Sequence, residues 1–278
     1  MHEVLSAMPR DSYRLIVDSG AFTAWNLNKE ISMKGYCDFL GSIKDLAPFK
    51  AVQLDVFGDH KQSWANYLHM VDEGLDVMPV FTRGESMERA EEMYSYTDYI
   101  MFGGVTIGRG NGQYVKWFLE RNKGRKAHWL GFVNLPFIKH YKPESVDASS
   151  WMSACRFGRV DLYAGGGQMK KYGPMDFIKP LTKEMKELCL INHITPSELS
   201  MLRYKESWKA NWKHDGNLDT QKKDKRSTAQ FIGTLANIIR AKEIEKKLGT
   251  KVYLACSLSL QIEFINQANK FLNDRGYY

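Results

Sequence analysis

The sequence predicts an α/β fold and, within that class, a (β/α)₈ barrel, known as a TIM barrel. Short apolar runs of strand length recur along the chain, segments with helical periodicity separate them, and the number of runs reaches eight. Strands that alternate with helices form parallel βαβ units, and eight such units suit a barrel in a chain of 278 residues. A doubly wound open sheet is the alternative. The barrel is favoured because no G-x-G-x-x-G motif opens a first helix.

The expected strands are short runs rich in Val, Ile, Leu and aromatic residues. They are RLIVD (14–18), AVQLD (51–55), VMPVFTR (77–83), YIMFGG (99–104), HWLGFV (128–133), ESVD (144–147), VDLYAGGG (160–167) and KVYLACS (251–257). Helical periodicity covers 33–46, 63–74 and 86–96, and Ser86 is a plausible N-cap for the last of these.

The alternation stops between Gly167 and Lys251. We expect one barrel domain over residues 1–278, with residues 168–226 inserted after the seventh strand as a helical subdomain that binds nucleic acid. The insertion mixes basic and aromatic residues, which pair with phosphates and stack on bases: Tyr204, Lys205, Trp208, Lys209, Trp212 and Lys213. An amphipathic helix whose tryptophans pack on the barrel explains the same pattern equally well.

The composition is that of a soluble globular protein, with 44% hydrophobic and 26% charged residues. No apolar run approaches the roughly 18 residues that span a bilayer, and the first residues lack the apolar core of a signal peptide, so we expect a cytoplasmic protein. Cys37, Cys155, Cys189 and Cys256 lie far apart without a C-x-x-C pair, which favours reduced thiols over disulfides or a zinc site.

A net charge of +7 and a pI near 9.0 make a polyanion a reasonable partner. Basic residues cluster at 121–126 and 220–226. The residues that we expect to contact nucleic acid are Lys222, Lys223, Lys225, Arg226, Arg156 and Arg159.

Three expected strands end in an aspartate: Asp18, Asp55 and Asp147. In a barrel these strand ends converge on the face where chemistry occurs. The fourth strand ends in Gly103 and Gly104, which would let a ligand touch the backbone closely.

Converging carboxylates allow two chemistries. They could bind a divalent metal, together with Asp59, but the only histidines near strand ends are His60 and His128. Without a metal, two carboxylates suit substitution at an anomeric carbon, one as nucleophile and the other as general acid and base. Glycosyl transfer is therefore favoured over metal-assisted hydrolysis, and neither a metal nor another cofactor is expected.

The same segments resemble, in order, elements of the tRNA-guanine transglycosylases. DSGAFT (18–23) is similar to their D-S-G-[GS]-[FY]-Q element, and SVDASSWMSACRFGR (145–159) to an F-D-S-A-S-Y-type segment. Between these, the similar segments are VQLDVF (52–57), FTRGE (81–85), YIMFGGVTIGRG (99–110) and HWLGF (128–132), and residues 239–265 resemble the closing helix, strand and helix.

The resemblance implies a role for each matching residue. Asp147 matches the nucleophile that displaces guanine, Asp18 the carboxylate that moves protons on the two bases, and Asp55 the one that binds the guanine edge. The remaining substrate-binding residues that it implies are Phe22 on one face of the base, Leu130 and Gly131 on the other, Arg83 beside it, and the Gly103 and Gly104 backbone at its carbonyl.

Three differences from the family's motifs indicate which of its branches the chain resembles. Two glutamines of the family are replaced, one by Thr82 or Arg83 and the other by Thr23. The C-x-C-x-x-C zinc site of the family is missing, and its region contains only Cys189 and His193. These losses point to the short DNA-guanine transglycosylases of phages and bacteria, which place a 7-deazaguanine base in DNA. The expected partners are therefore DNA and a free 7-deazaguanine. Exchange on tRNA and a catalytically silent nucleic-acid-binding barrel remain the alternatives.

Overall fold

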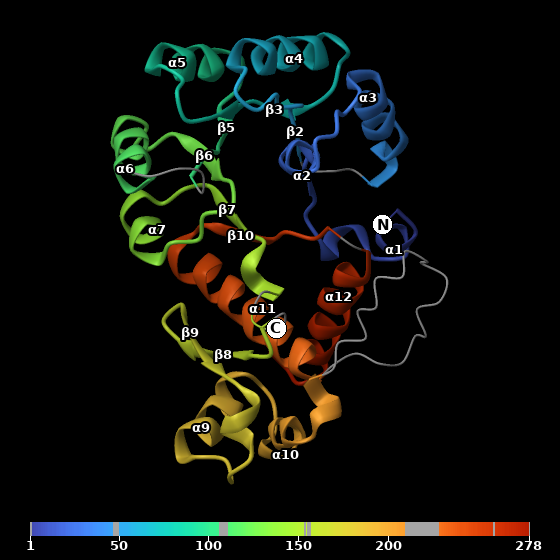
Figure 1. The fold of residues 1–278 in the computed structure, drawn as a ribbon, viewed down its shortest axis with the longest axis vertical. Coiled ribbons are helices and arrows are strands. Elements are labelled where there is room, and N and C mark those ends of the chain that lie inside the picture. The colour runs from blue at the N-terminus through green and yellow to red at the C-terminus, as the bar shows by residue number, and fades with distance from the viewer. Residues whose placement is uncertain are drawn as a thin grey trace. The chain divides into compact units, whose positions relative to one another are not determined.

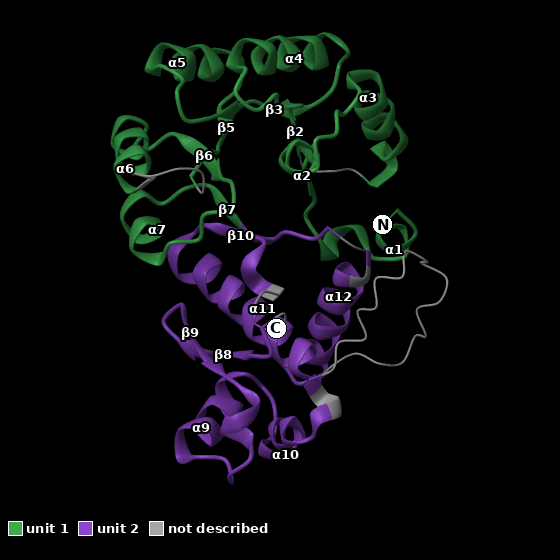
Figure 2. Ribbon diagram, in the orientation of Figure 1, with its two compact units in different colours: residues 1–147 green, residues 148–278 purple. Residues whose placement is uncertain are grey.

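The chain forms two compact units, Met1–Asp147 and Ala148–Tyr278 (Figure 2). The computed structural model describes residues 2–46, 50–105, 111–152, 154, 157–208, 228–257 and 259–277. Parallel strands and many helices confirm the α/β class. Within these described residues, no helix combines the length and the apolar character that crossing a membrane requires.

Unit 1 holds a row of parallel strands, each beside the next in chain order. The strands are β1 (Ile16–Val17), β2 (Lys50–Val52), β3 (Val77–Met78), β4 (Val80–Phe81), β5 (Tyr99–Phe102), β6 (Lys126–Trp129) and β7 (Ser145–Ala148). Each coincides with part of a predicted strand, because a buried parallel strand needs an almost continuous apolar run.

Pro79 divides the third predicted strand into β3 and β4. Proline has no N–H group, so it cannot donate to the hydrogen-bond ladder. Its carbonyl still accepts from the Met101 N–H at 2.8 Å, and on the other side Met78 accepts from Gln53 at 3.1 Å. The run 77–81 therefore joins β2 to β5 in spite of the break.

Helices follow these strands along the chain, and those from residue 33 onward lie on the outer side of the row (Figure 1). They are α1 (His2–Ser6), α2 (Ala21–Asn26), α3 (Met33–Ser42), α4 (His60–Asp72), α5 (Met87–Tyr96), α6 (Asn111–Arg121) and α7 (Leu135–Tyr141), with 3-10 turns at Arg10–Ser12 and Lys44–Leu46. The three predicted helices are confirmed with shifted ends. Ser86 does occupy an N-cap position, although its side chain makes no capping hydrogen bond.

Side chains from the strands share one buried cluster on the inner side of the row. It contains Val52, Met78, Val80, Tyr99 and Met101, with Ile16 and Leu130 packed against it. Ile16 belongs to β1 and Leu130 follows β6, so residues from both ends of this series of strands pack in one interior. The row of strands is therefore strongly curved. The described strands do not close into a hydrogen-bonded ring, so the structure establishes parallel sheets in an α/β fold.

The prediction that the seventh strand continues the parallel series is wrong. In unit 2, β8 (Val160–Gly165) pairs antiparallel with β9 (Gln168–Tyr172) instead of continuing a parallel series. The cause is the run Gly165, Gly166 and Gly167, whose φ angles of 87°, 60° and 82° lie in the left-handed region. Glycine adopts this region without strain, so the run makes a hairpin turn and not a loop into a helix.

The other elements of unit 2 are mainly helical. They are α9 (Lys183–Ile191), α10 (Pro196–Ser200), α11 (Thr228–Leu248), β10 (Lys251–Leu254) and α12 (Ser259–Asp274), with 3-10 turns at Ser150–Met152, Pro174–Phe177, Met201–Arg203 and Lys205–Trp208. The expected closing helix, strand and helix are thus α11, β10 and α12.

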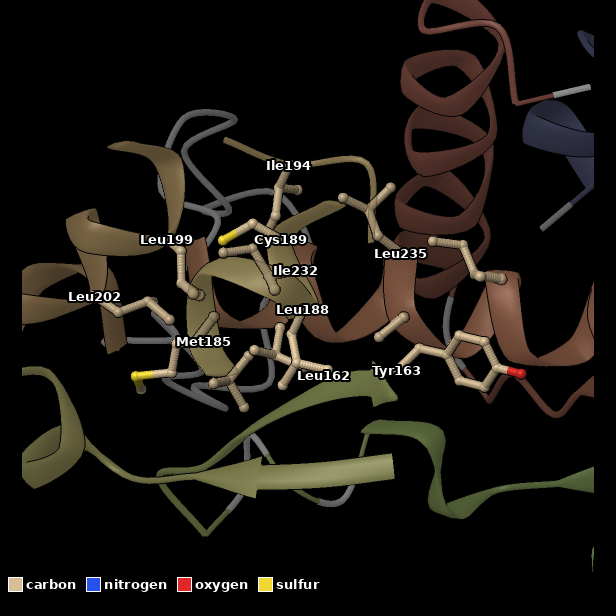
Figure 3. Close-up of a cluster of buried hydrophobic side chains, with 14 of the residues drawn as sticks. Leu162, Tyr163, Met185, Leu188, Cys189, Ile194, Leu199, Leu202, Ile232 and Leu235 are labelled. Atoms are coloured by element: carbon tan, nitrogen blue, oxygen red, sulfur yellow. The ribbon is translucent and has the colours of Figure 1, made fainter. Parts of the chain in front are cut away.

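One buried cluster joins these elements. Leu162 of β8, Met185 and Leu188 of α9, and Ile232 and Leu235 of α11 gather in it (Figure 3). The first part of the predicted insertion, residues 168–208, therefore shares its core with α11. Residues 209–227, including Trp212, lie outside the described residues.

Trp208 favours the packing interpretation of the basic and aromatic segment. Its indole N–H donates to the Leu202 carbonyl at 2.5 Å, and its ring lies 5.7 Å from that of Phe177. A side chain held this way in the core is not available for stacking on bases.

Candidate active site

Asp18 lies where β1 ends, and the residues after it form a tight turn into α2. Gly20 makes this turn with a φ of 73°, where a side chain would be strained, and its carbonyl accepts the first helical hydrogen bond, from Ala24 at 3.0 Å. The conformation of this turn therefore requires glycine at position 20.

The carboxyl group of Asp18 is accessible to solvent yet closely surrounded by protein. This crowding raises its pKa, hydrogen bonds from the backbone of Gly20 and Ser19 lower it, and the negative charge of Asp147 raises it again. The net direction is upward, which favours the protonated form of Asp18 over that of an ordinary aspartate. The influence of Asp147 also means that the ends of β1 and β7 share one electrostatic environment.

Asp55 follows β2 and is partly buried. Burial raises its pKa to about 7, the hydrogen bond from Gln53 Nε2 opposes this, and the charges of Asp18 and Glu85 add to it. The Gln53 bond to Asp55 Oδ1 measures 2.6 Å. At neutral pH the site therefore holds Asp55 close to the midpoint of its titration.

Asp147 lies on β7 with its side chain 16% exposed. Its Oδ1 accepts from the backbone N–H of Gly131 at 2.7 Å and lies 3.3 Å from His128 Nε2. Both partners come from β6 and the turn after it, so neighbouring strands fix the orientation of the carboxylate.

A chain of buried polar groups continues behind His128. Its Nδ1 contacts Ser145 Oγ, which lies 2.5 Å from the hydroxyl of Tyr99. His128 therefore contacts Ser145 through Nδ1 and Asp147 through Nε2, and these two buried contacts fix the ring that orients the aspartate.

Ser145, His128 and Asp147 contact one another in the order of a serine hydrolase triad. In such a triad the serine faces the substrate, whereas here the aspartate is the most exposed of the three side chains. Ser145 is 0% and His128 1% exposed, so no substrate can reach the hydroxyl. Asp147 is the member that meets solvent. The arrangement therefore presents a carboxylate as the reacting group and uses serine and histidine as its support.

Gly103 and Gly104 follow β5, and neighbouring strands explain both glycines. A Cβ at Gly103 would lie 3.2 Å from Val80 Cγ1, and one at Gly104 would lie 3.0 Å from the Arg83 nitrogen, with φ at 70°. These positions are glycine because β4 and its extension pack directly against them. Whether a ligand also approaches this backbone stays a prediction.

Arg83 and Leu130 border the same strand ends. The guanidinium of Arg83 lies over the Tyr114 ring at 5.4 Å, and the Tyr114 hydroxyl donates to the Gly103 carbonyl at 3.2 Å. Leu130 packs against the inner cluster, and Gly131, with φ at 64°, has no neighbour within 4 Å of an added Cβ.

Sequence analysis missed a second buried carboxylate, Glu85. Its side chain is 4% exposed, accepts from the Thr82 N–H at 2.5 Å, and has a pKa raised by burial. Thr82 Oγ1 also lies 3.1 Å from His60 Nδ1. The only signal was the position of Glu85 just after a strand end.

Three aromatic rings gather beside the aspartates. Phe22 and Trp25 lie on α2 and Phe57 lies just after Asp55, with ring centroids 5.2 to 6.2 Å apart. Phe22 alone was predicted as a base-stacking residue. The other two are new members of the site.

Asp59, one of the carboxylates that the metal hypothesis would use, has a structural role. The Asp59 carboxylate accepts from the Gln62 N–H at 2.9 Å and caps α4. Among the residues that the structure describes, no three His, Cys, Asp or Glu side chains are grouped so that they could hold a metal ion. The His193 ring packs against that of Tyr277, with centroids 4.8 Å apart.

The predicted nucleic-acid contacts are largely outside the described residues: Lys222, Lys223, Lys225, Arg226 and Arg156. Arg159 is described, is exposed, and immediately precedes β8 in unit 2. Comparison of the chain with family models, curated proteins and solved structures finds no match in any of the three.

Proposed function

We propose that this protein exchanges guanine in DNA for a free 7-deazaguanine base, on a (β/α)₈ barrel whose first strands are those of unit 1. The observation that carries the proposal is the pairing of Asp18 and Asp147. One carboxylate is accessible and has a raised pKa, and the other is oriented by two fixed partners. Carboxylates with such different surroundings suit an acid–base group and a nucleophile.

The first half of the reaction forms a covalent intermediate. An Asp147 carboxylate oxygen attacks C1′ of the deoxyribose, and the bond from C1′ to guanine N9 breaks. The electron pair of that bond leaves with guanine, and protonated Asp18 gives its proton to the departing base. The products are a glycosyl ester on Asp147, neutral guanine and ionised Asp18.

The second half reverses these steps with the new base. Ionised Asp18 takes the N9 proton of 7-deazaguanine, N9 attacks C1′, and the ester bond to Asp147 breaks. Asp18 is again protonated and Asp147 is again a carboxylate, so protons and charge balance without a redox cofactor or a nucleoside triphosphate. A group with a raised pKa is well suited to this repeated transfer.

Asp55 supports the choice of base. Guanine and 7-deazaguanine share the N1–H and 2-amino donors, and a carboxylate accepts from both. Burial raises the pKa of this acceptor to about 7, so its charge changes with pH in the neutral range. We assign the faces of the base to Phe22 and Leu130, its carbonyl edge to the Gly103 and Gly104 backbone, and further contacts to Arg83 and Gly131.

The net charge of +7 supports a polyanionic partner. A base within a duplex must leave the stack before its sugar can reach Asp147, and positive charge on the protein stabilises the distorted strand. This supports a nucleic acid over a free nucleoside, and the missing zinc motif favours DNA over tRNA.

Nucleoside mass spectrometry tests the proposal. The enzyme is incubated with 7-deazaguanine base and duplex DNA, and in parallel with tRNA, and each nucleic acid is digested. We expect the modified deoxynucleoside in DNA. Modified tRNA beside unmodified DNA would move the activity to the tRNA alternative, and two unmodified polymers bound by the protein would make it a silent binding barrel.

A further inference from the structure

We propose that Trp25, stacked on Phe57 and flanked by Phe22, offers a platform for an unpaired base of the nucleic-acid strand, next to the exchanged nucleotide whose base Phe22 covers. This inference takes its partner from the proposed function, but the ring surface itself comes from the structure. The three residues are called the aromatic platform below.

The rings of the aromatic platform are ordered against one another and open to solvent. Trp25 and Phe57 are stacked, with centroids 5.2 Å apart and planes at 18°. Phe22 is 49% and Trp25 51% exposed. Phe57 stacks on the indole and Phe22 lies tilted beside it, and half of the Trp25 surface remains exposed beyond these two contacts. A nucleobase stacks on an exposed aromatic ring whatever its identity.

The aromatic platform belongs to the strand ends of the candidate active site. Phe22 lies four positions after Asp18, and Phe57 two positions after Asp55. The backbone of α2 is closed by a hydrogen bond from Lys29 N to the Ala24 carbonyl at 2.8 Å, and Asn26 donates to the Phe22 carbonyl at 2.9 Å. These bonds hold the α2 backbone, and the mutual ring contacts order the side chains, which lowers the entropic cost of binding.

The size of the aromatic platform favours a base over a protein partner. Phe22 and Trp25 are about half exposed and Phe57 is partly buried, so the three side chains offer on the order of 250 Å², whereas a stable protein interface needs about 800 Å² from each partner. One base needs only one ring face. The same two segments also carry exposed Lys29 and Lys61, whose charges suit a phosphate backbone.

Fluorescence titration with oligothymidylate tests the aromatic platform. This single strand has no guanine, so it probes stacking without occupying the proposed guanine site. We expect it to bind and to quench tryptophan emission in the wild type. Trp25→Phe should bind but lose most of the quenching, because Trp25 is the one tryptophan that is more than about a third exposed among the described residues. Trp25→Leu should raise Kd roughly 5- to 100-fold, the usual effect of losing one stacked base.

Leu27→Ala is the matched control, because Leu27 is 61% exposed near Trp25 in the sequence and has no ring. Its Kd should equal that of the wild type. The inference is overturned if the wild type does not bind oligothymidylate, if Trp25→Leu binds as tightly as the wild type, or if Leu27→Ala weakens binding as much. It is also overturned if sedimentation shows a dimer that Trp25→Leu abolishes. Base exchange is measured separately, so quenching without exchange would reject the proposed function and leave the aromatic platform intact.

Discussion

Replacing Asp55 by asparagine should stabilise the protein while it impairs base exchange. Asparagine has nearly the same shape, and its oxygen can still accept from Gln53 at the place of the 2.6 Å bond. What it removes is a carboxylate whose charged form is disfavoured by burial and by the charges of Asp18 and Glu85. The substitution therefore isolates the cost of holding that charge in the folded protein.

The magnitude follows from the change in pKa on folding. A rise from 3.8 to about 7 corresponds to about 4 kcal/mol. The folded state binds the proton more tightly than the unfolded chain, so the free energy of unfolding of the wild type falls as pH rises from about 4 to about 7. The Asp55→Asn variant lacks this loss. Its advantage over the wild type should be smallest near pH 4 and approach about 4 kcal/mol above pH 7.

Urea denaturation at constant ionic strength, followed by tryptophan fluorescence from pH 4 to pH 8, measures this difference. Asp55→Asn should raise the midpoint increasingly with pH, and exchange activity should fall because a carboxylate that accepts two base donors is lost. A stability difference that is constant across this range, or that grows as pH falls, would refute the electrostatic reasoning. A group kept at a cost in stability is what a binding site is expected to contain.

Three further predictions concern the nucleophile, its support and the core of unit 2. Asp147→Asn should bind DNA as the wild type does but form no covalent adduct by intact-mass spectrometry; an adduct in this variant rejects Asp147 as nucleophile. His128→Phe keeps a planar ring but removes its nitrogens. It should slow single-turnover adduct formation on the order of 100-fold and leave DNA affinity unchanged. An unchanged rate of adduct formation would mean that Gly131 alone orients Asp147. In unit 2, Asn192 is 0% exposed; it accepts from the Tyr163 N–H at 2.9 Å and donates to the carbonyls of Tyr163 at 2.8 Å and Leu188 at 2.7 Å. Asn192→Ala should therefore lower the free energy of unfolding, measured by chemical denaturation, by about 3 kcal/mol. A decrease of less than about 1 kcal/mol would contradict this account.

The sequence was sufficient to locate the strands of unit 1 and the residues at their ends. Buried parallel strands are continuous apolar runs, so a residue such as Asp18 or Asp55 that ends the run is visible without a structure. Strand direction was not visible in the same way. Gly165 and the two glycines after it are compatible with a loop or a hairpin, and pairing with β9 decides between them.

The support of Asp147 could not be predicted, because it depends on the register between two strands. His128 lies opposite Ser145 in the pairing of β6 with β7. A shift of one residue would turn the histidine to the other face of the sheet. The partners of Trp25 were hidden for a similar reason, since Phe57 reaches it from a different strand end.

The division of the chain has an evolutionary consequence. Asp18, Asp55 and Asp147 all belong to unit 1, as do Glu85 and the aromatic platform. Substitutions in residues 148–278 away from β10, the neighbour of β7, replace none of these side chains. Under the proposed function, a lineage could keep its base chemistry and still acquire a new nucleic-acid target by changing the second half of the gene.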